Sequence, residues 1–138
     1  MKAIIKIVGT QTVDGEKDVI EMTTGGSLER QGDGWKLCYN ETEATGMEGT
    51  VTTLDIEPGK LNLMRSGTHP SMLVLEKNCR HHCNYRTPYG NIDLGTYTSE
   101  LDYDLSETGG QLKFSYTLGF NGGINSAHTV QITVQEET

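Results

Sequence analysis

The chain has 138 residues, enough to bury a core without a disulfide or a structural metal, and its hydrophobic content of 34% suits an antiparallel sheet with one wet face. Its 11 Lys and Arg against 19 Asp and Glu give a formal net charge of −8, which repels phosphate backbones and anionic lipid, so we expect no nucleic-acid partner and no membrane partner. No segment approaches the roughly 20 apolar residues of a membrane span, and Lys6 interrupts the apolar start, so we expect neither a transmembrane segment nor a signal peptide. We therefore expect a cytoplasmic location, where the three cysteines would be reduced thiols.

The first half of the chain is predicted to be a series of strands separated by turns. Residues 2–9 form the first expected strand, and glycine-containing turns follow at residues 14–15, 31–34 and 58–59. Apolar side chains alternate with polar ones over residues 35–39 and again over residues 61–65, where Arg65 continues the apolar face. Residues 72–75 are apolar on both faces, so we expect them to be central in the sheet or covered.

The same alternation runs through the second half of the chain. Two strands are predicted from their apolar faces, which comprise Leu112, Phe114, Tyr116, Leu118 and Phe120 in one and His128, Val130, Ile132 and Val134 in the other. No stretch has a convincing helical pattern, since the best candidate, residues 41–47, is short and broken by a glycine. Short connections favour pairing of neighbours, so we predict one all-β domain, residues 1–138, folded as an antiparallel up-and-down meander barrel of about eight to ten strands.

Four stretches resemble a known family: residues 61–67 (LNLMRSG), residues 87–94 (TPYGNIDL), residues 110–116 (GQLKFSY) and the closing residues 126–136. Through them the chain resembles, over nearly its whole length, the YwiB-like family of uncharacterised bacterial proteins. The resemblance implies a calycin-type, lipocalin-like antiparallel β-barrel, and it implies no reaction, ligand or catalytic residue. The Gly-x-Trp element of lipocalins proper is absent, because Gly34 stands directly before Trp35 and well inside the chain.

The run of residues 79–83, Cys-Arg-His-His-Cys, has the composition of a metal site, with Cys79, His81 and Cys83 as candidate ligands. In a strand, the two cysteines would lie about 13 Å apart at roughly 3.3 Å per residue, whereas thiolates on one zinc lie within about 4 Å of each other. The strand alone therefore cannot chelate, and we expect solvated side chains and no cofactor. A metal site stays open as an alternative if the fold brings Cys38 beside them, and a redox thiol is a further alternative.

Arg65 and His128 are the strongest candidates for ligand binding, because each continues an otherwise apolar strand face. A buried guanidinium needs partners, and the alternatives are an internal carboxylate, a place at the barrel mouth, or an anionic group of a ligand. His128 is either a hydrogen-bonded core histidine or a ligand contact. Tyr97 and Tyr116 lie in expected strands and would add hydroxyl groups to a cavity wall, although tyrosine is also an ordinary strand residue.

The sequence favours a small-molecule-binding barrel, with an anionic or amphipathic ligand near Arg65 and His128, and this hypothesis predicts a cavity. The alternative is a packed barrel that acts through its outer surface as a subunit or a homodimer, with residues 72–75 supplying an apolar patch. An enzyme is least favoured, because the common nucleophile, phosphate and dinucleotide motifs are absent; His81, His82 and His128 are its obvious acid–base candidates.

Overall fold

The computed structural model describes residues 1–45, 48–67, 71–87, 90–120 and 126–137, without the side chains of residues 71, 83–87 and 91–92. Ten strands and one short 3-10 helix make up this described part of the chain. In chain order they are β1 (Lys2–Val13), β2 (Glu16–Gln31), β3 (Gly34–Asn40), η1 (Glu43–Thr45), β4 (Thr50–Glu57), β5 (Lys60–Gly67), β6 (Ser71–Glu76), β7 (Arg80–Thr87), β8 (Gly90–Ser106), β9 (Gly109–Phe120) and β10 (Ser126–Glu136). Within those residues, no helix has the length and the apolar character needed to cross a membrane.

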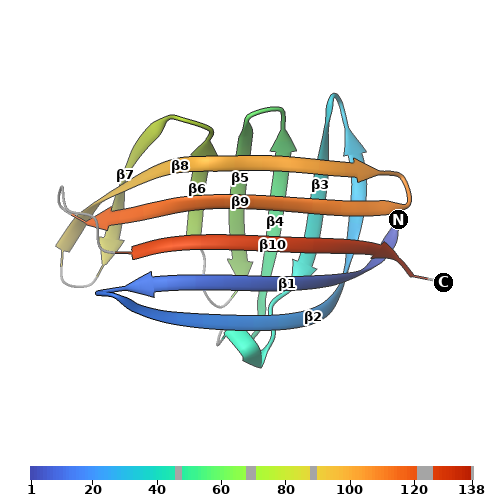
Figure 1. Ribbon diagram of the computed structural model, residues 1–138, viewed down its shortest axis with the longest axis horizontal. Coiled ribbons are helices and arrows are strands. Elements are labelled where there is room, and N and C mark those ends of the chain that lie inside the picture. The colour runs from blue at the N-terminus through green and yellow to red at the C-terminus, as the bar shows by residue number, and fades with distance from the viewer. Residues whose placement is uncertain (46–47, 68–70, 88–89, 121–125, 138) are drawn as a thin grey trace.

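All ten strands belong to one antiparallel sheet with the order β6-β5-β4-β3-β2-β1-β10-β9-β8-β7. The strands β1 to β6 form one meander and β7 to β10 form a second, and the ladder between β1 and β10 joins the two. In Figure 1 the sheet is folded into two layers, with β1, β2, β8, β9 and β10 running across the front and β3 to β6 running up and down behind them. The expectation of an all-β antiparallel barrel of eight to ten strands is confirmed.

The two ends of the sheet meet where β6 approaches β8, through a few contacts in place of a continuous ladder. Lys77 and Thr98 form an isolated parallel bridge, and the backbone amide of Asn78 donates a hydrogen bond to the Thr98 carbonyl at 2.8 Å. The Thr96 hydroxyl donates to the Val74 carbonyl at 3.3 Å. We call this contact between residues 74–78 and 96–98 the seam. It makes the sheet a nearly closed barrel, in which neighbour pairing along the chain is broken between β6 and β7.

The core lies between the two layers, and β2 passes from one layer to the other beside it. Residues 16–27 of β2 pair with β1, whereas residues 26–31 pair with β3. At the crossing, a Cβ on Gly26 would collide with the backbone carbonyl of Cys38 and the side chain of Ile5, so glycine permits the close approach. Large side chains fill this part of the barrel, and they include Ile5, Leu37, Leu54, Ile56, Leu61, Leu75, Leu112, Phe114 and Ile132.

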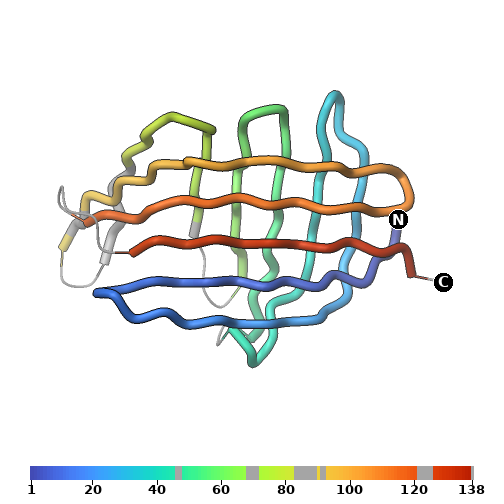
Figure 2. The backbone as a smooth tube through the Cα atoms, in the orientation of Figure 1, coloured from blue at the N-terminus to red at the C-terminus, as the bar shows by residue number. Residues whose placement is uncertain are grey.

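The backbone trace follows most of the expected strands and turns, with one correction (Figure 2). Asp14 and Gly15 form a two-residue turn with φ of 51° and 81°, as tight hairpins require. Residues 72–75, expected to be central or covered, instead form β6 at one end of the sheet order, and that prediction is wrong. Leu73 and Leu75 face the core, but Met72 is 57% exposed, because an end strand of the sheet needs only one apolar face.

Candidate ligand-binding pocket

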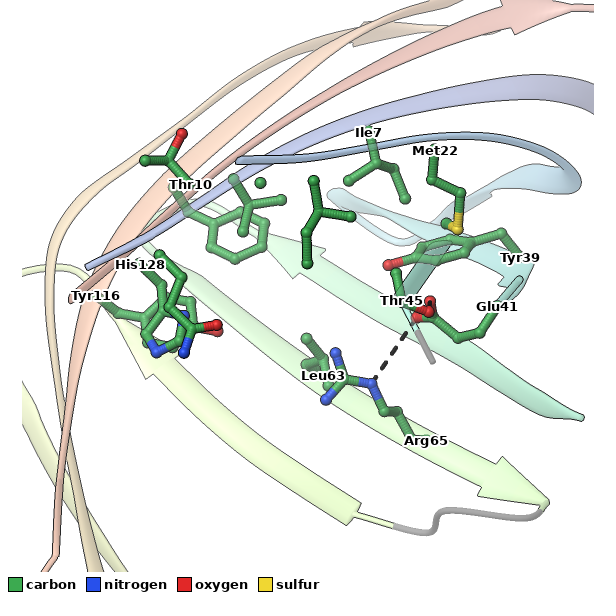
Figure 3. A pocket seen from close by; sticks show the side chains of 15 residues that line it. Ile7, Thr10, Met22, Tyr39, Glu41, Thr45, Leu63, Arg65, Tyr116 and His128 are labelled. Atoms are coloured by element: carbon green, nitrogen blue, oxygen red, sulfur yellow. Dashed lines mark hydrogen bonds and ion pairs between the residues drawn. The ribbon is translucent and has the colours of Figure 1, made fainter. Parts of the chain in front are cut away.

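A pocket of about 230 Å³ lies inside the barrel beside the core (Figure 3). It opens to solvent near Gln11 and Ile20, which are both exposed. At about 30 Å³ per water molecule, the space holds about eight waters or a ligand of about eight non-hydrogen atoms. Its apolar wall includes Ile7, Met22, Leu63, Phe114 and Val130, and its polar groups include Tyr39, Glu41, Arg65, Tyr116 and His128.

Gly9 leaves part of this space open. It lies in β1 between Ile20 of β2 and Val130 of β10, and all three residues line the pocket. A Cβ built on Gly9 would meet no atom within 4 Å, and the φ of Gly9 lies outside the left-handed region. Neither the backbone nor a close neighbour therefore requires glycine here, and the missing side chain contributes to the volume of the pocket.

Arg65 and Glu41 face each other at the polar end of the pocket (Figure 3). The Glu41 side chain is 2% exposed; its Oε1 accepts a hydrogen bond from the Thr52 hydroxyl at 2.6 Å, and its Oε2 accepts one from the Thr45 hydroxyl at 2.9 Å. Arg65 Nε lies 3.9 Å from Glu41 Oε1, which is an ion pair too long to be a hydrogen bond. This Nε is buried and donates no hydrogen bond, whereas the Arg65 side chain as a whole is 23% exposed. No hydrogen bond joins the rest of the guanidinium to the residues that the structure describes.

The titratable rings of the pocket are neutral at pH 7. Burial raises the pKa of Tyr39, and the Glu41 carboxylate raises it further. Burial also raises the pKa of Tyr116, although the positive charge of Arg65 opposes the shift. His128 stacks on Tyr116 with 4.8 Å between ring centroids, and burial lowers the pKa of His128. The charges in the pocket are therefore one guanidinium and one carboxylate.

The structure brings together three of the four residues expected to bind a ligand. Arg65, Tyr116 and His128 all line the pocket, and the His128 Nε2 lies 2.8 Å from the Ser126 hydroxyl. The expected place of Tyr97 in the cavity is wrong, because it contacts Arg80 instead, with the guanidinium carbon 5.9 Å from the ring centroid.

A bulge in β8 explains the position of Tyr97. The pairing with β9 shifts between Thr98 and Glu100. Before this bulge the even-numbered residues Thr96 and Thr98 are buried, whereas after it the buried residue is Leu101. An alternation counted backwards from Leu101 therefore places Tyr97 on the inner face, and the extra residue moves it to the outer one.

Two of the three candidate metal ligands, Cys79 and His81, do not line the pocket. Cys79 is exposed in the turn before β7, and His81 Nε2 lies 3.0 Å from Glu76 Oε1. The side chain of Cys83 lies outside the described residues. The spacing estimate for two thiolates supposed both cysteines in one strand, but β7 begins at Arg80, so the strand includes Cys83 and leaves out Cys79. Among the side chains that the structure describes, no three His, Cys, Asp or Glu residues are grouped so that they could hold a metal ion.

Two features of the pocket were missed in the sequence. Glu41 continues the inward alternation of Trp35, Leu37 and Tyr39, and this period of two was the available signal. A carboxylate after an apolar run also suits the start of a loop, so this pattern alone does not place Glu41 in the pocket. Gly9 carried no such signal, because a space opposite a glycine depends on the strands that surround it.

The fold and the pocket define a class, the antiparallel β-barrel with an internal pocket that opens to solvent. The chain belongs to the family of the domain of unknown function DUF1934, whose model matches residues 5–132. It is 25% identical over 125 residues to the uncharacterized beta-barrel protein YwiB of Bacillus subtilis (strain 168), covering 91% of this chain and 87% of that protein.

The fold is also that of a solved relative. The crystal structure of the ywiB protein from Bacillus subtilis matches with a TM-score of 0.84 at 22% sequence identity, over 99% of this chain and 92% of that one. The barrel expected from the resemblance to the YwiB-like family is therefore confirmed.

Proposed function

We propose that the protein binds a small amphipathic molecule inside the barrel, with the apolar part of the ligand against Phe114 and Val130 and its polar part at Arg65. The observation that carries this proposal is the Arg65 guanidinium. It stands at a pocket with an apolar wall, and it makes no hydrogen bond to the described residues. The Arg65 side chain is 23% exposed, but its Nε is buried without a hydrogen bond. A buried donor without a partner is costly, and an acceptor group on a ligand would supply that partner.

The pocket favours this function over the packed barrel that acts through its surface, because a packed barrel has no cavity. The apolar patch expected from residues 72–75 is also small: Leu73 and Leu75 are buried, which leaves Met72 beside Met64 and the half-buried Val74. By analogy with calycin-type carriers, a barrel of this kind encloses its ligand, although fold alone does not assign function. A cytoplasmic place is part of the proposal, and the free thiols of Cys38 and Cys79 support it.

Native mass spectrometry of protein purified from its own source tests the proposal. We expect an adduct of a few hundred daltons or less that is lost in Arg65→Met, which removes the cation but keeps most of the side-chain length. Arg80→Met is the matched control, because Arg80 is exposed and lies outside the pocket. A bare chain in the wild type, or an adduct that both variants retain, would contradict the proposal, and the same spectra report whether the chain is a dimer.

A further inference from the structure

Glu41 and Arg65, the two charged residues of the pocket, differ in how many of their hydrogen-bonding atoms already have partners. Each oxygen of Glu41 accepts a hydroxyl hydrogen bond, one from Thr52 and one from Thr45. Arg65 has five N–H donors, and within the described residues its one charged contact is the 3.9 Å ion pair with Glu41. The unmet hydrogen-bonding capacity is therefore that of a donor, and the matching ligand group is an acceptor with negative charge.

The charge around Arg65 limits how much negative charge a ligand can carry. A phosphate monoester brings −1.5 to −2 at pH 7, whereas the pocket offers one guanidinium that Glu41 already opposes, and a His128 that is neutral. A carboxylate brings a single charge, and its two oxygens match the edge of a guanidinium. The remaining wall, formed by residues such as Leu63 and Phe114, is apolar.

Given that the barrel binds a ligand at all, we infer that this ligand is a small monocarboxylate of about eight non-hydrogen atoms whose carboxylate pairs with Arg65. Glu41 then acts as the internal competitor of the ligand, because its carboxylate lies 3.9 Å from the Nε of the same guanidinium. Binding brings a second carboxylate next to Glu41, and the repulsion between the two limits the affinity. Glu41 is thus a specificity-determining residue: it disfavours ligands with two or more negative charges.

Hexanoate is a suitable probe, since it has six carbons and two oxygens and so matches the pocket volume of about 230 Å³ at roughly 30 Å³ per atom. Hexan-1-ol and hexylamine are the neutral and cationic controls. We expect NMR titrations of the wild type to give the lowest dissociation constant for hexanoate, with shift changes at Gly9 and Val130. In Glu41→Gln, which keeps an acceptor but removes the charge, hexanoate should bind about fivefold more tightly, as expected for removing one partly exposed charge interaction.

The results separate this inference from the proposed function. If the wild type binds hexylamine or hexan-1-ol more tightly than hexanoate, the inference that the ligand is a carboxylate is overturned. This comparison does not require any variant to fold. Weaker binding of hexanoate in a folded Glu41→Gln variant overturns the role of Glu41 as a competitor. In either case an Arg65-dependent adduct in the native mass spectrum would leave the proposed function standing, whereas a wild-type chain without any adduct would overturn both the proposed function and this inference.

Discussion

Filling the space beside Gly9 tests whether the barrel is hollow. In Gly9→Val the new side chain adds three carbons, which at roughly 30 Å³ each occupy about 40% of the 230 Å³ pocket. Partial burial of valine contributes about 1 kcal/mol, and replacing glycine where the backbone accepts any residue contributes another ~0.4–1 kcal/mol. We expect the free energy of unfolding to rise by about 1–2 kcal/mol and hexanoate binding to be lost.

Urea denaturation of this variant and of Gly25→Val measures the effect. Gly25 is a matched control: it also has no atom within 4 Å of a built Cβ, it lies in the neighbouring strand β2, and its position is exposed outside the pocket. The control gains the backbone contribution alone, about 0.4–1 kcal/mol, and keeps its ligand. If Gly9→Val lowered the free energy of unfolding by more than about 1 kcal/mol, as overpacking typically does, the claim of open space beside Gly9 would be refuted. Equal gains in stability in both variants would refute it as well.

Three further predictions concern the histidine, the strand crossing and the seam. Because burial lowers the pKa of His128 below 6.5, the unfolded chain binds a proton at this residue before the folded one as the pH falls, so the free energy of unfolding should decrease below about pH 6.5. Urea titrations at pH 7.5 and 5.5 should show a smaller decrease in His128→Gln than in the wild type. Equal decreases in the two proteins would contradict this. Gly26→Ala should lose about 1–3 kcal/mol through the collision with the Cys38 carbonyl, whereas an unchanged thermal midpoint would show that β2 can move. At the seam, Asn78 has a φ of 61°, a left-handed conformation that valine adopts only at a cost. In urea melts, Asn78→Val should therefore lower the free energy of unfolding by about 1–2 kcal/mol, whereas Asn78→Gly should change it by no more than about 0.5 kcal/mol. Equal losses in the two variants would mean that the left-handed backbone is not the cause.

The strands could be predicted because their signal is local. The alternation over residues 112–120 and 128–134 depends on the pleat of one strand against one core. The structure follows it over residues 112–116 and 130–134, whereas Phe120, expected on the inner face, is 39% exposed near the end of β9. The inward position of Arg65 follows from the same rule, since it continues the face of Leu61 and Leu63. The period of two thus identifies both the core and the charged group that interrupts it.

Features that depend on two or more strands could not be predicted. The bulge that moves Tyr97 outward exists because β8 and β9 differ by one residue in register, which neither strand shows alone. The exposure of Met72 depends on where the sheet ends, and the seam that sets this end consists of contacts between residues far apart in the sequence. The open space at Gly9 likewise needs two neighbouring strands and the opposite wall before it exists.

The ladder between β1 and β10 determines when the barrel can close during synthesis. The meander β1 to β6 leaves the ribosome first, and its β1 edge has no partner until residues 126–136 have been made. An unpaired apolar edge is the part of a nascent sheet most exposed to wrong pairing with other chains. The strand β10 therefore joins both halves of the sheet, and a ribosome that stalls before it leaves two open edges, β1 and β9, on a chain whose nine preceding described strands have already been made.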